Sequence, residues 1–189
     1  RNGNNELDTG MHYLIDPLAS LGHTVELFDT VNPEKPFNAL LNDFNPDLVF
    51  CCLTGNPNHT PYDPLHSILR LTRLGKIKTF NWFCDDTWRF DSFSSQMCWI
   101  FNHCSTPEPT CVDKFKEIGY DNIHLAPWYA NVDCFPELEK DIDISFVGGI
   151  TPDRQQFFAS CEVPITGAQG LSIDELFQFY SRTKIGVNL

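Results

Sequence analysis

The sequence predicts an α/β protein, in which a Rossmann-like lobe on a parallel sheet is followed by the beginning of a second Rossmann-like lobe. Short apolar segments alternate with segments of helical periodicity, and residues 47–53 are almost continuously apolar. Such continuity is typical of a strand whose sheet is covered on both faces. Strands that alternate with helices form right-handed βαβ units and parallel sheets.

The first lobe is expected to span residues 1–134. Apolar residues at offsets of three and four predict a first helix over 7–21, which Gly22 ends. Strands are then predicted over 24–28, 47–53, 77–83, 99–104 and 122–125. Helices are predicted over 36–44, 64–74 and 88–97, and a last one starts at a capping box of Ser105 and Glu108 and ends near Gly119.

Residues 135–141 are charged, contain a proline and show no apolar periodicity, which predicts an interdomain linker. The beginning of the second lobe follows over 142–189. It is predicted to contain strands over 142–147, 163–166 and 184–189, a helix over 153–161, and a helix with a capping box of Ser172 and Glu175.

Both ends of the repeat are interrupted. No strand precedes the polar loop at residues 1–5, and a sheet of about three strands does not bury both faces. We therefore expect a fragment of a larger two-lobed enzyme, in which the first lobe folds but cannot catalyse a reaction alone.

The amino-acid composition limits the classes of binding partner that are expected. The net charge is −12, from 13 basic and 25 acidic residues without a Lys/Arg cluster, so nucleic acid and anionic membranes are not expected as partners. No apolar stretch is long enough for a transmembrane segment. The eight cysteines lack a C-x-x-C spacing and are expected to be free thiols in a reducing, cytoplasmic compartment. The six histidines lack the spacing of paired ligands, so no metal is expected.

Two carboxylates, Asp85 and Asp86, directly follow the predicted strand at 77–83. Ligands of open parallel sheets bind beyond the carboxyl ends of the strands. Nearby tryptophan and phenylalanine rings would desolvate one carboxylate and raise its pKa, so that it acts as a catalytic general base. The alternative is that Asp86 caps the following helix and Asp85 is solvated.

Glycines mark the expected ligand-binding positions. Gly148 and Gly149 follow the first strand of the second lobe, where backbone N–H groups approach an anion and Arg154 pairs with phosphate oxygens. Gly167 follows the next strand, and Gly3 lies in the polar loop at the start. Plain turns would use the same residues.

The order of these segments resembles that of the GT-B glycosyltransferases and, within them, the CgeB-like (spore-maturation) group. The helix-to-strand passage LASLGHTVELFD at 18–29 is similar to the GT-B pattern. The CgeB-like segments are WFCDD at 82–86, FKEIG at 115–119, LAPWYAN at 125–131 and DISFVG at 143–148. The stretch between Arg154 and Lys184 is shorter than in that family.

The resemblance implies two Rossmann-like lobes that face a cleft, with the acceptor on the first and the nucleotide sugar on the second, usually without a metal. It implies a glycosyltransferase that transfers a sugar to a hydroxyl of an unknown glycan, protein or small molecule. It places Asp85 or Asp86 on the acceptor side, and Gly148, Gly149 and Arg154 near the donor diphosphate. The alternative is a non-catalytic, two-lobed small-molecule binding protein.

Overall fold

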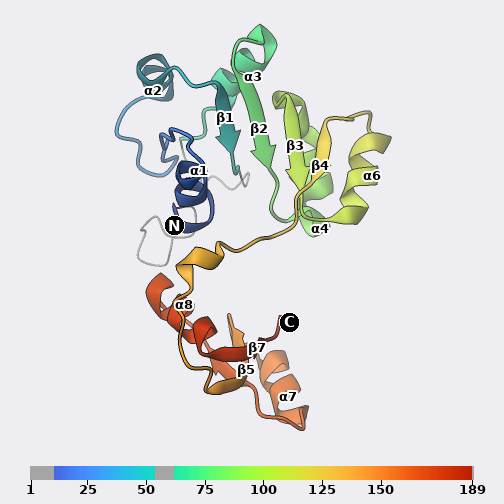
Figure 1. Cartoon of the computed structure of the whole chain (residues 1–189). Coiled ribbons are helices and arrows are strands. Elements are labelled where there is room, and N and C mark those ends of the chain that lie inside the picture. The colour runs from blue at the N-terminus through green and yellow to red at the C-terminus, as the bar shows by residue number, and fades with distance from the viewer. Residues whose placement is uncertain (1–10, 54–61, 189) are drawn as a thin grey trace. The chain divides into compact units, whose positions relative to one another are not determined.

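The computed structural model describes residues 11–53 and 62–188. Its contacts divide the chain into two compact units, which are taken one at a time below. One unit is Glu26–Trp128, and the other joins Tyr129–Leu189 to the segment that ends at Val25. Each unit contains a parallel sheet flanked by helices, so the predicted α/β, Rossmann-like fold class is confirmed (Figure 1).

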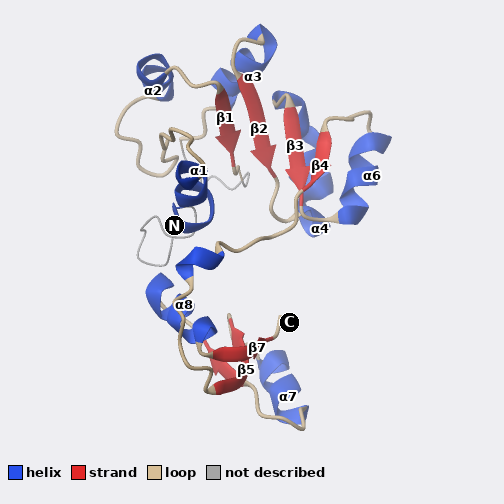
Figure 2. Ribbon diagram, viewed as in Figure 1, coloured by secondary structure: helices blue, strands red, loops and turns tan. Residues whose placement is uncertain are grey.

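The unit Glu26–Trp128 contains a four-stranded sheet in the order β1-β2-β3-β4 (Figure 2). All three strand pairs are parallel. The strands are β1 (Leu48–Cys51), β2 (Lys78–Trp82), β3 (His103–Thr106) and β4 (Ile123–Leu125). The main helices are α2 (Phe37–Phe44), α3 (Leu65–Leu74), α4 (Asp86–Arg89), α5 (Ser95–Met97) and α6 (Pro109–Glu117), and a π-helical turn, Phe90–Ser94, joins α4 to α5.

The core of this unit lies on one face of the sheet. Each crossover moves to the next strand in the same direction, and right-handed crossovers of that kind place their helices on the same face. Alternation in β1 buries Val49 and Cys51, whereas Leu48 and Phe50 are 50% and 40% exposed on the opposite face. The core contains Val49, Cys51, Leu53, Ile68, Phe83, Phe90, Cys98, Phe101, Cys104, Cys111, Phe115, Tyr120 and Ile123.

Buried polar side chains connect the strands to one another and to the segments between them. The Leu53 amide donates to Oδ1 of Asn81 at 3.1 Å, which ties the end of β1 to β2. The Thr79 amide donates to Oδ1 of Asn102 at 3.0 Å, and the Asn102 amide donates back to Oγ1 of Thr79 at 3.0 Å. Buried polar atoms are costly without partners, so these bonds favour a single alignment of the strands.

The other unit contains a three-stranded parallel sheet in the order β6-β5-β7. Its strands are β5 (Ile142–Val147), β6 (Thr166–Ala168) and β7 (Thr183–Gly186), and its helices are α1 (Asp16–Ser20), α7 (Pro152–Ser160) and α8 (Ile173–Ser181). A π-helical turn, Met11–Ile15, precedes α1, and a 3-10 turn, Val132–Cys134, lies ahead of β5. The crossovers from β5 to β6 and from β6 to β7 run in opposite directions, so the right-handed rule places α7 and α8 on opposite faces.

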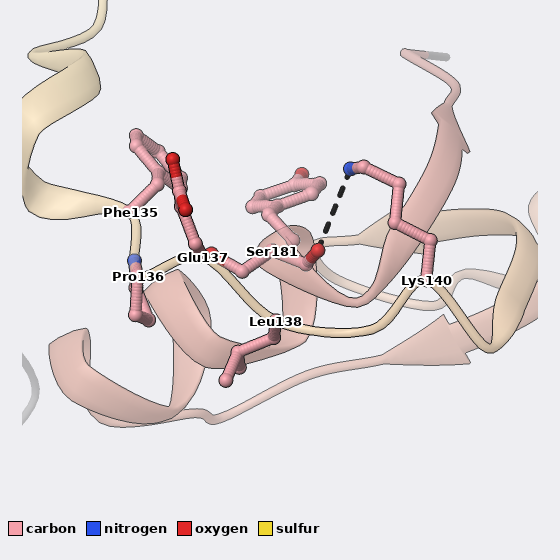
Figure 3. Close-up of a pocket in the computed structure, with 7 residues that line it drawn as sticks. Phe135, Pro136, Glu137, Leu138, Lys140 and Ser181 are labelled. Carbon is pink, nitrogen blue, oxygen red and sulfur yellow. Dashed lines mark hydrogen bonds between the residues drawn. The ribbon is translucent and has the colours of Figure 1, made fainter.

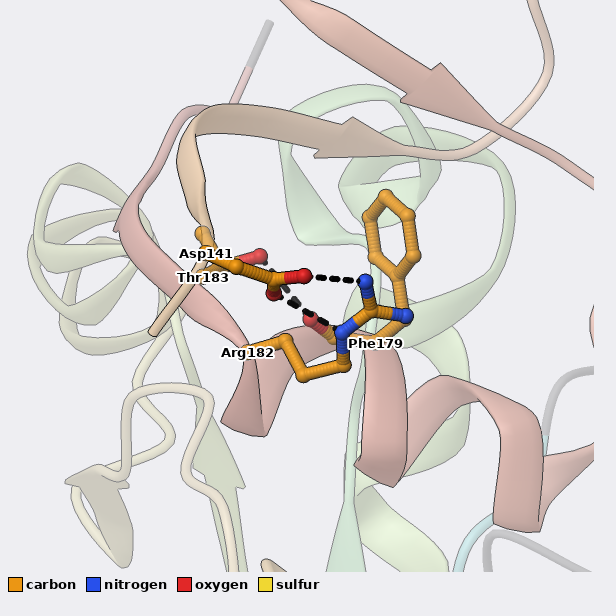
Figure 4. A network of polar contacts seen from close by, with 4 residues as sticks. All are labelled: Asp141, Phe179, Arg182 and Thr183. Atoms are coloured by element: carbon orange, nitrogen blue, oxygen red, sulfur yellow. Dashed lines mark hydrogen bonds and ion pairs between the residues drawn. The ribbon is translucent and has the colours of Figure 1, made fainter. Parts of the chain in front are cut away.

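The predicted linker, residues 135–141, is attached to α8 and β7. The Lys140 ammonium donates to the carbonyl oxygens of Thr183 at 2.7 Å and Ser181 at 3.4 Å, beside a pocket that Phe135–Leu138 and Tyr180 also line (Figure 3). The Arg182 guanidinium donates to both carboxylate oxygens of Asp141, at 2.8 and 2.5 Å (Figure 4). The segment therefore forms part of the surface of this unit.

Several predicted elements have other bounds in the structure. Residues 24–28 form no strand, because no described segment pairs with them; instead Phe28 packs against Phe37 with ring centroids 5.1 Å apart. The strand predicted at 99–104 begins only at His103, because Cys98–Ile100 forms a 3-10 turn. The strand predicted at 163–166 is β6, and it starts at Thr166.

One predicted capping box is absent and the other is present. Ser105 lies inside β3, where it is paired with Trp82 and His124, so it cannot cap α6, and Glu108 is the N-cap residue without a side-chain bond. Ser172 and Glu175 cap α8 reciprocally, because the Glu175 amide donates to Oγ of Ser172 and the Ser172 amide donates to the Glu175 carboxylate. The latter prediction is confirmed.

Within residues 11–53 and 62–188, the helices are too short or too polar to cross a bilayer.

The core packing of the unit Glu26–Trp128 predicts a difference between two isoleucines. Ile68 is fully buried in the core, so Ile68→Ala is expected to lower the free energy of unfolding by about 2–5 kcal/mol. Ile118 is 40% exposed, and Ile118→Ala is expected to cost less than about 1 kcal/mol. Urea titrations followed by tryptophan fluorescence report on this unit alone, because all four tryptophans lie in it. Equal losses in the two variants would contradict the described core.

Candidate functional site

The carboxyl ends of β1 and β2 present acidic and aromatic side chains. β2 ends at Trp82, and the Phe83 amide still donates to the Ser105 carbonyl at 2.8 Å. The chain then turns through Cys84 and Asp85 into α4. Parallel pairing places the ends of β1 and β2 beside one another, so this edge is where a Rossmann-like sheet presents functional side chains.

Asp85 is the N-cap residue of α4 and is half-buried. Its carbonyl oxygen accepts from the amides of Arg89 at 3.1 Å and Trp88 at 3.4 Å, which fixes the start of the helix. Its side chain makes no hydrogen bond to the first turn of α4. The Asp85 carboxylate is thus held at the sheet edge without being used to cap the helix.

Asp86 is completely buried at the first position of α4. Neither carboxylate oxygen makes a hydrogen bond of normal geometry. Burial raises the pKa of Asp86 above its usual range, and the nearby hydroxyls of Ser94 and Thr106, which favour the charged form, only partly offset this rise. In this arrangement Asp85 reaches solvent and Asp86 does not.

Asp63 is a third acidic residue at this edge, and sequence reasoning missed it. It lies just before α3, a crossover helix whose N-terminus lies at the carboxyl end of β1. Its Oδ1 is buried without a partner, and burial raises the pKa of Asp63 to about 6, although the Leu65 amide favours the charged form. Burial is the main cause that raises the pKa of the Cys51 thiol, and the negative charge of Asp63 adds to this rise. A carboxyl group with such a pKa suits proton transfer near neutral pH.

The signal that could have revealed Asp63 is its place between an apolar strand and a helix start. Residues 54–62 separate Asp63 from the predicted strand at 47–53, so the sequence did not show that Asp63 lies near the end of that strand.

Two exposed tryptophans follow the carboxyl ends of β2 and β4 along the chain. Trp88, in α4, is 68% exposed, and the Arg89 guanidinium lies 4.7 Å from its ring centroid. Trp128 is 61% exposed and packs edge-on against Trp82 with centroids 4.8 Å apart. Flat exposed rings of this kind can stack on a sugar or another apolar ring face.

A second candidate site lies at the carboxyl end of β5, in the other unit. Gly148 has φ +155°, and a Cβ there would lie 2.8 Å from Cζ of Phe146, so a side chain does not fit. The Gly148 amide donates to the Ala168 carbonyl at 3.0 Å, whereas Gly149 is exposed and a Cβ there would meet nothing within 4 Å. Gly148 is therefore required by the geometry of the turn, whereas the exposed Gly149 leaves the backbone accessible to a ligand.

The turn leads directly into the N-terminus of α7. The Thr151 hydroxyl accepts from the Arg154 amide at 3.3 Å and caps the helix. The Arg154 guanidinium donates through Nη1 to the Gly149 carbonyl at 2.6 Å and lies 4.9 Å from the Phe146 ring centroid. Arg154 therefore holds the glycine turn and also places positive charge there.

Gly167 lies next to this turn, because β6 pairs with β5. A Cβ at Gly167 would lie 3.0 Å from Cδ1 of Ile150, and the Ile150 amide donates to Oε1 of Gln169 at 3.0 Å. Gly167 lies inside β6 and not after the strand as expected, and its pairing with Phe146 brings it close to Gly148, Gly149 and Arg154. Gly3 lies outside the described residues.

The winding direction of the sheet reverses between β5 and β7. The order β6-β5-β7 is the 2-1-3 arrangement at the start of a flavodoxin-like sheet, whose direction of winding reverses between the first and third strands. Ligands of such sheets bind at that reversal. The Gly148 turn lies there.

No cluster of three metal-binding side chains exists among residues 11–53 and 62–188. In comparisons with known proteins, no family model, no curated protein and no solved structure matches this chain.

The buried Asp86 predicts a specific pH dependence of stability. Because its pKa is raised in the folded state, its contribution to stability is fully present below pH ~4, the usual carboxyl pKa, and is lost as the pH rises through the folded value. Asp86→Asn cannot ionise, so its unfolding free energy is expected to fall less than that of the wild type between pH 4 and 7. Urea titrations across this range measure the difference, with exposed Asp121→Asn as the control. Parallel pH profiles for wild type and Asp86→Asn would contradict this account.

The two glycines of the β5 turn are expected to respond differently to substitution by alanine. Gly148→Ala is expected to destabilise the sheet β6-β5-β7 by more than about 1 kcal/mol, because its Cβ would overlap the Phe146 ring. Gly149→Ala is expected to leave stability nearly unchanged. Amide hydrogen exchange of β5 measures both, and equal protection in the two variants would show that the turn is not constrained as described.

Proposed function

We propose that this protein is a glycosyltransferase that transfers a sugar from a nucleotide-sugar donor to an acceptor hydroxyl. The observation that carries the proposal is the glycine turn at Gly148 and Gly149, which leads from the central strand of a doubly wound sheet into a helix N-terminus. The resemblance of the sequence to CgeB-like glycosyltransferases supports the same reaction.

The donor diphosphate would bind at the turn after β5. The N-terminus of α7 offers the positive end of the helix dipole and the Asp153 amide, because Pro152 has no N–H and Thr151 caps the Arg154 amide. The exposed Gly149 lets an anion approach the backbone, and the Arg154 guanidinium, held on the Gly149 carbonyl, places positive charge at the turn. These groups would neutralise the negative charge that develops on the leaving diphosphate.

The acceptor would bind at the carboxyl ends of β1 and β2. A carboxylate there, Asp63 or Asp85, would take the proton from the acceptor hydroxyl as its oxygen bonds to the anomeric carbon and the bond to the diphosphate breaks. The pKa of about 6 suits Asp63 to this role, and the half-buried Asp85, after the neighbouring strand β2, is the other candidate. Exposed Trp88 and Trp128 would stack on an acceptor sugar ring.

A non-catalytic small-molecule binding protein is the alternative. It accounts for the glycine turn equally well, but it gives no role to a carboxyl group whose pKa lies near neutrality at a sheet edge. Asp63 is therefore the residue that distinguishes the two functions.

Donor binding is tested by calorimetry with uridine, guanosine, adenosine and thymidine diphosphates. At least one is expected to bind, and Arg154→Gln is expected to weaken it by about 10–100-fold, the effect of one charge-assisted hydrogen bond. Arg73→Gln, in the last turn of α3, is the control for loss of a positive charge. Absence of binding by all four, or equal binding by both variants, would contradict the proposal.

The base is tested by turnover of the natural protein that carries this sequence, measured as release of nucleoside diphosphate. Asp63→Asn or Asp85→Asn is expected to lower kcat by about 10²–10⁴-fold, and exposed Asp91→Asn is the control. If Asp63 is the base, the wild-type rate rises as the pH passes about 6, and Asp63→Asn loses this rise. Full activity in both variants would remove the catalytic role, and a wild type without turnover would favour the binding protein.

A further inference from the structure

Two histidines lie side by side on the sheet of the unit Glu26–Trp128, away from its core. His103 begins β3 and His124 is the middle residue of β4. Their neighbours Cys104 and Ile123 are buried in the core, and because side chains alternate along a strand, both histidines project from the opposite face. Both side chains are exposed.

The strand register brings the two rings together. Ser105 pairs with His124, so His103 and His124 are diagonal neighbours, a spacing that aromatic side chains bridge. Nδ1 of His103 and Nε2 of His124 are 3.2 Å apart, and the ring centroids are 5.3 Å apart with a tilt of 32° between planes. One nitrogen of each ring is therefore directed at the other ring.

This separation is also that of two ligands on one metal ion. A tetrahedral zinc ion with Zn–N distances of about 2.0–2.1 Å holds its nitrogen ligands roughly 3.3–3.4 Å apart. We propose that His103 and His124 bind one divalent transition-metal ion, such as Zn²⁺, Ni²⁺ or Cu²⁺, through Nδ1 and Nε2 respectively. The ring that donates in the free pair moves its proton to its other nitrogen, so both lone pairs reach the ion.

The site is expected to be open and exchangeable. No third histidine, cysteine or carboxylate joins the pair within the described part of the chain, so water or an external ligand completes the coordination. Imidazole nitrogen favours transition metals over Mg²⁺ or Ca²⁺. The net charge of −12 raises the local concentration of cations. This proposal is independent of the proposed function.

The test is titration of the purified chain with Zn²⁺ and with Ni²⁺ at pH 7.5, followed by calorimetry and by NMR of the imidazole nitrogens. One ion is expected to bind, shifting Nδ1 of His103 and Nε2 of His124. His103→Ala and His124→Ala are each expected to weaken binding about tenfold or more, and the double variant about as much as either single one. His66→Ala, an exposed histidine of α3, is the control and is expected to bind as the wild type does.

Two results would overturn the proposal. In one, both single variants bind metal with wild-type affinity, which would assign the ion to the free thiols or to another position. In the other, the imidazole nitrogens of the wild type do not shift, which would leave the pair a hydrogen bond only. The NMR measurement on the wild type avoids any dependence on the folding of the variants.

Discussion

The parallel register of the strands is the constraint on which the rest of the structure depends. It gathers the carboxyl ends of β1 and β2 at one edge and those of β5, β6 and β7 at another. In the four-stranded sheet, Asn81, Thr79 and Asn102 make buried hydrogen bonds that a slipped register would break. A slip of one residue would also turn Val49 and Cys51 out of the core.

The acidic residues at the carboxyl ends of β1 and β2 differ in how deeply they are buried. Asp85 and Asp86 are adjacent in sequence, yet one is half-buried and the other has no contact with solvent. Burial raises the pKa of Asp86, so its ionisation works against folding. Asp63 is intermediate: its pKa is raised by burial, but its side chain is still partly exposed. A group in this intermediate environment can both exchange protons and meet a ligand.

Elements that depend on residues close together in the sequence were predictable. Residues 142–147 were expected as a strand and form β5, and the capping box of Ser172 and Glu175 is present, since both depend on neighbours in the sequence. Ser105 and Glu108 have the same capping pattern, but pairing of Ser105 in β3 excludes it. A strand was expected at 24–28, but isolated β-propensity does not form a strand without a partner.

The candidate sites were predictable only where their residues directly follow a strand in the sequence. The glycines after β5 were found in this way, and β5–β6 pairing brings Gly167 to them. Asp63 lies twelve residues after the end of β1 in sequence. His103 and His124 are 21 residues apart, so only the strand register reveals their proximity. Residues that meet across neighbouring strands have no fixed spacing along the chain, so a single sequence does not reveal them.

The central claim is that the carboxyl edges of the sheets bind the ligand. Hydrogen exchange with and without a bound nucleoside diphosphate tests it most directly. The account predicts slower exchange at Gly149, Ile150 and the first turn of α7, with no change at the amino ends of β5 and β7. Protection confined to those amino ends, or to helix surfaces far from the glycine turn, would contradict it.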